Sequence, residues 1–222
     1  MHRYRIAAFL TGCLILGSLF MIFVATQNFA TVDRVLAALP QEAKQMFQTL
    51  GPENARLLLR YLAGEENRLF FTSWELAQIA LGALLTAILL LAVKSAQAAE
   101  CGPKRERNFG EIGRTRGESA VREFLRSRLL AGMAGTMLIV ALFQHFRVTP
   151  EMIALGRLVD FGGGTGSAAY SQFWRLHELY GVLEVVKLAL LIVVAGILLF
   201  GRRSKAREPA EVSSAVSTFA EQ

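Results

Sequence analysis

The chain has 222 residues, of which 53% are hydrophobic, and a formal net charge of +6. That composition alone also fits a soluble protein with a large core, so the order of the apolar residues decides the class of protein. The basic residues flank apolar stretches, and those of the C-terminal segment are not interleaved with aromatic residues, so nucleic-acid binding is not indicated.

Four apolar stretches predict four membrane-spanning helices. Ile6–Val32 has 27 residues without a formal charge, Leu76–Val93 and Leu129–Phe146 have 18 each, and a fourth runs from about Leu179 to Gly201. A hydrocarbon core roughly 30 Å thick needs about 20 helical residues. Lipid offers no partner for an open backbone, and no alternating barrel pattern appears. We therefore expect an all-α, polytopic membrane four-helix bundle.

The distribution of basic residues predicts the orientation of these helices. The N-terminus, the segment 94–128 and the C-terminal segment together hold 15 Lys and Arg residues, whereas the other two loops hold eight. Because cytoplasmic loops are enriched in basic residues, we expect a multi-pass protein of the plasma (inner) membrane with both termini cytoplasmic. The basic middle loop is expected to attract anionic lipid. The first stretch exceeds a normal signal-peptide core, which favours an uncleaved helix.

The first outer loop, Asn28–Arg68, is predicted to contain amphipathic helices. Apolar residues with helical spacing precede Pro40, Gln41–Leu50 has the pattern of a polar helix, and Gly51-Pro52 is a break followed by a new helix start. We expect these helices to lie on or against the outer face of the bundle. A soluble cap that binds a partner is the alternative.

The sequence divides into four parts. Residues 1–94 form the first transmembrane hairpin with its long helical outer loop, 95–118 a cytoplasmic linker, 119–203 the second transmembrane hairpin, and 204–222 a cytoplasmic tail. The linker is rich in glycine and charge, and the tail is rich in Ser, Ala and Glu. Both compositions predict disorder.

Two short matches indicate an internal repeat. Gln27–Phe29 closes the first span and Gln144–Phe146 closes the third, an offset of 117 residues. Phe70–Leu76 opens the second span and Phe173–Leu179 opens the fourth, an offset of 103 residues. Because two helices per unit preserve direction, we expect two parallel repeated hairpins related by an axis along the membrane normal.

The predicted topology gathers polar side chains in the outer leaflet. Lys187 lies about 21 Å from Gly201 along the fourth helix, inside the hydrocarbon, so it should face the bundle and pair with Glu184. This pair is either a structural ion pair or part of a proton, ion or substrate site. The candidate site consists of Glu184, Lys187, Tyr180, Glu75, Gln78, Gln27 and Gln144.

Individual members of this set have more specific predictions. Glu75 and Glu178 lie nearer the interface and are expected to be wetted boundary residues, whereas Gln78 should make an interhelical hydrogen bond. His145 and His177 close one hairpin, where two imidazoles can ligate a haem iron axially. The main expectation is no cofactor, with haem or metal at these histidines as the alternative.

The chain resembles an uncharacterised family of four-helix membrane proteins that is similar to eukaryotic transmembrane protein 205. The resemblance rests on Gly17–Phe20 in a first span that ends near Gln27–Phe29, on Trp74–Gln78 and on Phe173–Tyr180. It implies a helical bundle of unsettled role and supplies no catalytic residues. A weaker likeness is to membrane copper-resistance proteins, whose histidine pattern is largely missing here.

These observations favour a non-enzymatic membrane protein, either a small transporter-like unit or an accessory or assembly subunit. Four helices make a narrow bundle, so a transport path predicts a homodimer or a larger membrane complex. No Ser/His/Asp arrangement, paired-carboxylate signature or Cys/His cluster indicates hydrolysis or zinc chemistry. The alternative function is a haem- or metal-binding redox accessory protein that uses His145 and His177.

Overall fold

The computed structural model describes residues 2–101, 112–161 and 166–200, and apart from short turns these residues are helical. In chain order the elements are α1 (His2–Ala37), α2 (Gln41–Leu50), α3 (Pro52–Cys101), α4 (Ile112–Phe143), the π-helical turn η1 (Gln144–Val148), α5 (Thr149–Phe161) and α6 (Ala168–Phe200). These elements confirm the all-α prediction for the described ranges. The predicted tail, 204–222, lies outside them, as does the central part of the predicted linker.

Four helical segments are long and apolar enough to cross a membrane, as in a multi-pass membrane protein. They are His2–Ala37, Pro52–Ala98, Val121–Asp160 and Ala168–Phe200. Large apolar side chains cover their outer surfaces: Phe9 and Leu16 are each 70% exposed, and Ile139 and Val185 are each 67% exposed. Such a surface is stable in lipid, where an apolar side chain needs no protein partner.

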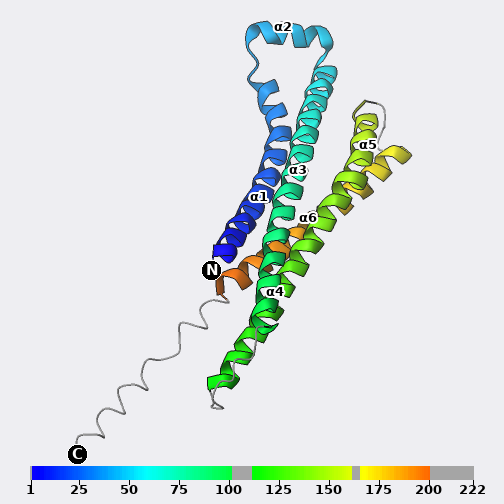
Figure 1. The fold of residues 1–222 in the computed structure, drawn as a ribbon. Helices are drawn as coiled ribbons and strands as arrows, with labels where there is room; N and C mark the ends of the chain where they lie inside the picture. The colour runs from blue at the N-terminus through cyan, green and yellow to red at the C-terminus, as the bar shows by residue number, and fades with distance from the viewer. Residues whose placement is uncertain (1, 102–111, 162–165, 201–222) are drawn as a thin grey trace, which may run out of the picture.

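Figure 1 shows α2 lying across the ends of α1 and α3. Gly51, with φ +80°, turns the chain after α2, and Pro52 begins α3 because a missing N–H is tolerated in a first helical turn. We call this part of the molecule the α2 end and the opposite part, where α1 begins and α6 ends, the terminal end.

The structure corrects the predicted arrangement of the first loop. Segments 28–37 and 52–68 are not separate amphipathic helices but continuations of α1 and α3, and α2 alone is a separate helix between them. No proline interrupts either segment after its first residue, so the helical hydrogen bonds continue beyond the apolar stretches. Likewise, α3 and α4 extend from both sides into the predicted linker.

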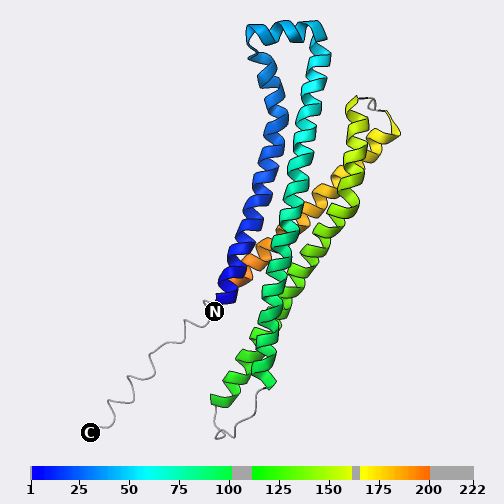
Figure 2. The same ribbon diagram turned by 45° about the horizontal axis from the view of Figure 1, so that its top comes forward.

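Helix α3 packs against α1 on one side and α4 on the other, while α6 contacts α1, α4 and α5 (Figure 2). The apolar core lies in the half of the bundle toward the terminal end. Fully buried members include Leu14 from α1, Leu85 and Leu89 from α3, and Leu130 from α4. On α6, Leu191, Val194 and Leu198 complete it.

Helices α4 and α5 form one rod that is joined by the π-helical turn η1. The predicted third span ended at Phe146, but the helix continues to Phe161. Within η1, the Thr149 N–H donates to the carbonyl of Gln144, five residues earlier. Pro150 follows directly; it has no N–H, and its ring crowds the carbonyl of residue 146, so the α-helical ladder is interrupted here.

Candidate functional site

Directly on the α2 side of the apolar core, all four long helical segments contribute buried or half-buried polar side chains. We call this set the polar layer. It consists of Ser18, Glu75, Gln78, Gln144, His145, Thr149, Tyr180, Glu184 and Lys187. Charged groups in such a position are costly unless they are paired, so their partners decide what the site can do.

Lys187 is the centre of the first half of the polar layer. It is only 3% exposed, and its Nζ donates to Glu184 Oε1 at 2.7 Å and to Gln78 Oε1 at 2.5 Å. The amide of Gln78 donates in turn to Ser18 Oγ at 3.3 Å, which connects α6, α3 and α1. The predictions that Lys187 faces the bundle and pairs with Glu184, and that Gln78 bonds across helices, are confirmed.

Gln144 extends this network from η1. Its side chain is fully buried, and Nε2 donates to Glu184 Oε1 at 3.4 Å and to the Tyr180 carbonyl at 3.3 Å. Its Oε1 and the Tyr180 hydroxyl have no hydrogen-bond partner among the described residues. The Tyr180 hydroxyl interacts electrostatically with the carboxylates of both Glu184 and Glu75. The phenol therefore lies near both carboxylates.

Glu75 is the centre of the second half. Its side chain is 0% exposed; Oε1 accepts from Thr149 Oγ1 at 2.5 Å, and Oε2 lies 3.0 Å from His145 Nδ1. The prediction that Glu75 is a wetted boundary residue was wrong. It was made from the depth of the residue along the helix, whereas burial depends on which helix face meets the α4–α5 rod.

The π-helical turn directs polar side chains of the rod toward two neighbouring helices, α3 and α6. Gln144 and Val148 are buried, and Gln144 bonds to α6, whereas His145 and Thr149 bond to Glu75 on α3. An i→i+5 turn inserts one residue per turn and so changes the faces that successive side chains occupy; such turns occur frequently at functional sites. The turn places the rod's polar side chains between α3 and α6.

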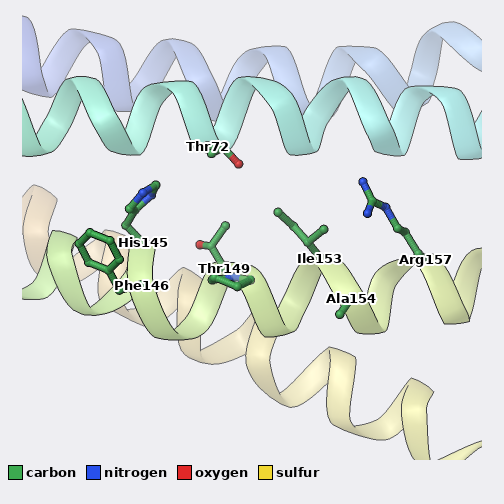
Figure 3. A pocket seen from close by; sticks show the side chains of 8 residues that line it. Thr72, His145, Phe146, Thr149, Ile153, Ala154 and Arg157 are labelled. Carbon is green, nitrogen blue, oxygen red and sulfur yellow. The ribbon is translucent and has the colours of Figure 1, made fainter.

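A groove between α3 and α5 opens beside the second half of the polar layer (Figure 3). Its volume is about 480 Å³, and it is open to the outside of the protein. His145, Ile153 and Arg157 point into it from the rod, and Thr72 points into it from α3. Apolar side chains line most of the remaining surface of the groove. His145 is thus one of the few polar side chains in the wall of the groove.

Beside the first half lies a smaller cavity of about 10 Å³, lined by Ser18, Gln78 and Lys187 together with apolar side chains. That volume is about the space a single water molecule requires, and three polar side chains are enough to bind one. The cavity continues the polar layer toward the apolar core.

Two ion pairs, Glu65–Arg157 and Arg68–Asp160, connect α3 to α5 at the α2 end of the groove. Arg157 donates to both oxygens of Glu65, at 2.8 and 3.0 Å, and Arg68 donates to Glu65 at 2.6 Å and to Asp160 at 2.5 Å. Glu65 lies outside the apolar part of α3, which begins at Leu76. Its hydrogen bond with Arg157, followed by the charge and hydrogen bond of Arg68, lowers the pKa of Glu65 to about 2.

Two residues predicted for the site have other partners. Gln27 is half-buried and accepts a hydrogen bond from Arg34 at 2.7 Å, within α1. His177 is exposed, stacks on Phe173 and meets the edge of Trp174, whereas His145 bonds to Glu75. The described contacts of the two histidines thus go to different groups, and haem ligation stays a prediction.

Ser18 and Thr149 are members of the polar layer that the sequence did not indicate. Both are small hydroxyl residues, which are common in membrane helices, so their presence alone does not point to a site. Thr149 follows a segment that contains three polar residues, Gln144, His145 and Arg147, and it precedes a proline. This local interruption of an apolar helix was the available clue.

Among the described residues, no three or more His, Cys, Asp or Glu side chains are grouped in a way that holds a metal ion. Comparison of the chain with protein-family models, with curated proteins and with solved structures finds no match.

Proposed function

We propose that this protein is a small proton-coupled transporter unit whose polar layer binds and releases a proton within the membrane. The observation that carries the proposal is the pair of carboxylates, Glu75 and Glu184, held within the bundle. His145 and Thr149 bond to Glu75, and Gln144 and Lys187 bond to Glu184. Ionisable side chains inside a membrane protein are costly, and they mark ion pathways and proton relays.

Charge balance supports one exchangeable proton at this site. Lys187 and Glu184 neutralise each other at 2.7 Å. Glu75 and His145 carry no net charge together when one proton is added to the carboxylate and the neutral imidazole. That proton lies either on His145, as imidazolium beside carboxylate, or on Glu75, as carboxylic acid beside imidazole. Because an apolar environment disfavours net charge, a proton that leaves this pair needs an acceptor inside the bundle.

The first half of the layer provides such an acceptor. The Tyr180 hydroxyl stands near both carboxylates, and Gln144 Oε1 offers an unused acceptor. A proton that leaves Glu75 therefore has a neighbouring route toward Glu184, through the phenol or a water molecule between them. Movement of a proton from Glu75 to Glu184 changes the charge of one carboxylate on α3 and of one on α6.

We also propose the wider setting of this activity. The distribution of basic residues supports an orientation in the plasma (inner) membrane with both termini cytoplasmic, which places the α2 end outside. The basic middle segment supports contact with anionic lipid. Since four helices enclose little space, we propose that a homodimer or larger complex completes the transport path. We further propose that the two hairpins are parallel repeats and that the chain belongs to the transmembrane protein 205-like family.

A flux measurement tests the proposal. Purified protein is reconstituted into lipid vesicles that contain a trapped pH-sensitive dye, and a potassium gradient with valinomycin sets the potential. We expect the internal pH to follow an external acid step faster than in protein-free vesicles, and Glu75→Gln and Glu184→Gln to abolish the difference. Glu178→Gln, on an exposed position of α6, is the matched control and should keep the flux. Wild-type vesicles that respond no faster than protein-free ones would overturn the proposal.

A further inference from the structure

We infer that the groove between α3 and α5 is the path by which protons reach the polar layer, and that His145 is the residue that transfers them to Glu75. This inference rests on the proposed function and names the entry point of the same site. It comes from the position of His145, which belongs both to the wall of the groove and to the hydrogen bonds of Glu75.

The side chains of His145 and Glu75 differ in exposure, as a proton relay from the groove to Glu75 requires. The His145 side chain is 17% exposed, whereas the Glu75 carboxylate is 0% exposed and bonded on both oxygens. Nδ1 of His145 is turned to Glu75 Oε2, and the ring also lines the groove. A proton from the groove thus meets the imidazole before the carboxylate.

Imidazole chemistry fits this position. A proton from water in the groove binds to Nε2 and gives the imidazolium. The Nδ1–H bond then breaks while an O–H bond forms on Glu75 Oε2, which leaves a neutral imidazole that carries its proton on Nε2. Release follows the same steps in reverse. A heavy-atom distance of 3.0 Å between Nδ1 and Oε2 is within the range for direct proton transfer.

The other charged groups around His145 do not prevent this transfer. On α3 it bonds to Glu75, and the Tyr180 hydroxyl of α6 lies near the carboxylates of both Glu75 and Glu184. On α5, Arg157 lies in the same groove, but its guanidinium is bound to both oxygens of Glu65. The positive charge at that end of the groove is therefore balanced, and a hydrated proton is not repelled by an unpaired cation.

Thr149 also bonds to Glu75, so proton transfer by His145 can be tested separately from the hydrogen bond that holds the carboxylate. Thr149 Oγ1 already fixes Oε1, so the carboxylate keeps a donor when His145 is replaced. A glutamine at position 145 retains an N–H donor for Oε2 but accepts no proton at neutral pH. His145→Gln thus separates the transfer of a proton from the structural hydrogen bond.

The experiment follows protonation of Glu75 directly in full-length protein in lipid. A light-triggered acid step is applied, and time-resolved infrared spectroscopy records the carbonyl band of the protonated carboxyl, which Glu75→Gln identifies by its loss. We expect His145→Gln and His145→Ala to slow the appearance of the band roughly 100-fold, the scale of catalysis by a positioned proton-transfer group. Imidazole added to His145→Ala should restore the rate, because it enters the groove and occupies the vacated space. His177→Ala should keep the wild-type rate.

Three outcomes would overturn the inference: a wild-type rate in His145→Gln, no rescue of His145→Ala by imidazole, or no band that depends on Glu75. These outcomes are separate from failure of the proposed function. Vesicle flux with a His145-independent band rejects His145 as the entry residue alone. A His145-dependent band without vesicle flux rejects transport and leaves the entry path in place.

Discussion

Lys187 on α6 donates a hydrogen bond of 2.5 Å to Gln78 on α3, 109 residues earlier in the chain. The same ammonium bonds to Glu184, and Gln78 bonds to Ser18, so one buried cation connects three helices. In an apolar environment such a connection is specific, because any other packing of these helices leaves a charge or an amide without a partner.

Lys187→Met should destabilise the protein by about 3–5 kcal/mol, because it leaves the Glu184 carboxylate without its cation. Lys187→Met combined with Glu184→Gln removes both charges and should be more stable than the sum of the two single changes predicts. Unfolding in mild detergent, followed by helical circular dichroism, measures all four proteins. Additive effects of the two substitutions would contradict a coupled pair.

Gly17→Ala should destabilise the bundle by about 1–3 kcal/mol, the range for an overpacked core. A Cβ at Gly17 would lie 2.0 Å from the Trp74 ring, so the indole must move, and with it the neighbouring Glu75. Gly12→Ala is the control on the same helix, since a Cβ there meets nothing within 4 Å, and it should not destabilise. The measurement is thermal unfolding with tryptophan fluorescence in a Trp174→Phe background. Equal effects of the two substitutions would contradict the close contact.

The Glu65 cluster should make stability sensitive to acid. The pKa of Glu65 is lowered to about 2 from an ordinary value of 4.5, so its contribution is complete above about pH 4.5 and is lost as the pH falls toward 2. Wild-type melting temperature should therefore fall more steeply in this interval than that of Glu65→Gln. Glu66→Gln, at the adjacent exposed position, should retain the wild-type slope. Parallel curves for wild type and Glu65→Gln would count against the cluster.

Thiol labelling in intact cells tests the proposed orientation. In a Cys13→Ser, Cys101→Ser background, Met46→Cys introduces a thiol on α2, where the methionine is 72% exposed. An impermeant maleimide should label it in intact cells if the α2 end is outside. Gln97→Cys, on an exposed position near the terminal end of α3, should react only after lysis. The reverse pattern would place the termini outside.

The predicted repeat illustrates what a sequence match does not decide. It pairs Gln27 with Gln144 and Glu75 with Glu178, at equal depths in their helices. In the structure Gln144 and Glu75 are fully buried, whereas Gln27 is half-buried and Glu178 is exposed. Similar residues at one depth can face a neighbouring helix or lipid, and the repeat itself stays a prediction.

The sequence by itself determined the four apolar helices, the break around α2 and the burial of Lys187 with Glu184. These properties depend on hydrophobic length, on Gly and Pro, and on the cost of a lone charge in hydrocarbon, which are local. Tertiary structure alone decided that Glu75 is buried, that His145 and Thr149 bond to it, and that His177 is exposed. The reason is rotational: the π-helical turn and the packing of the α4–α5 rod select which helix face meets which neighbour, and helices that are apolar on all sides carry little information about that choice.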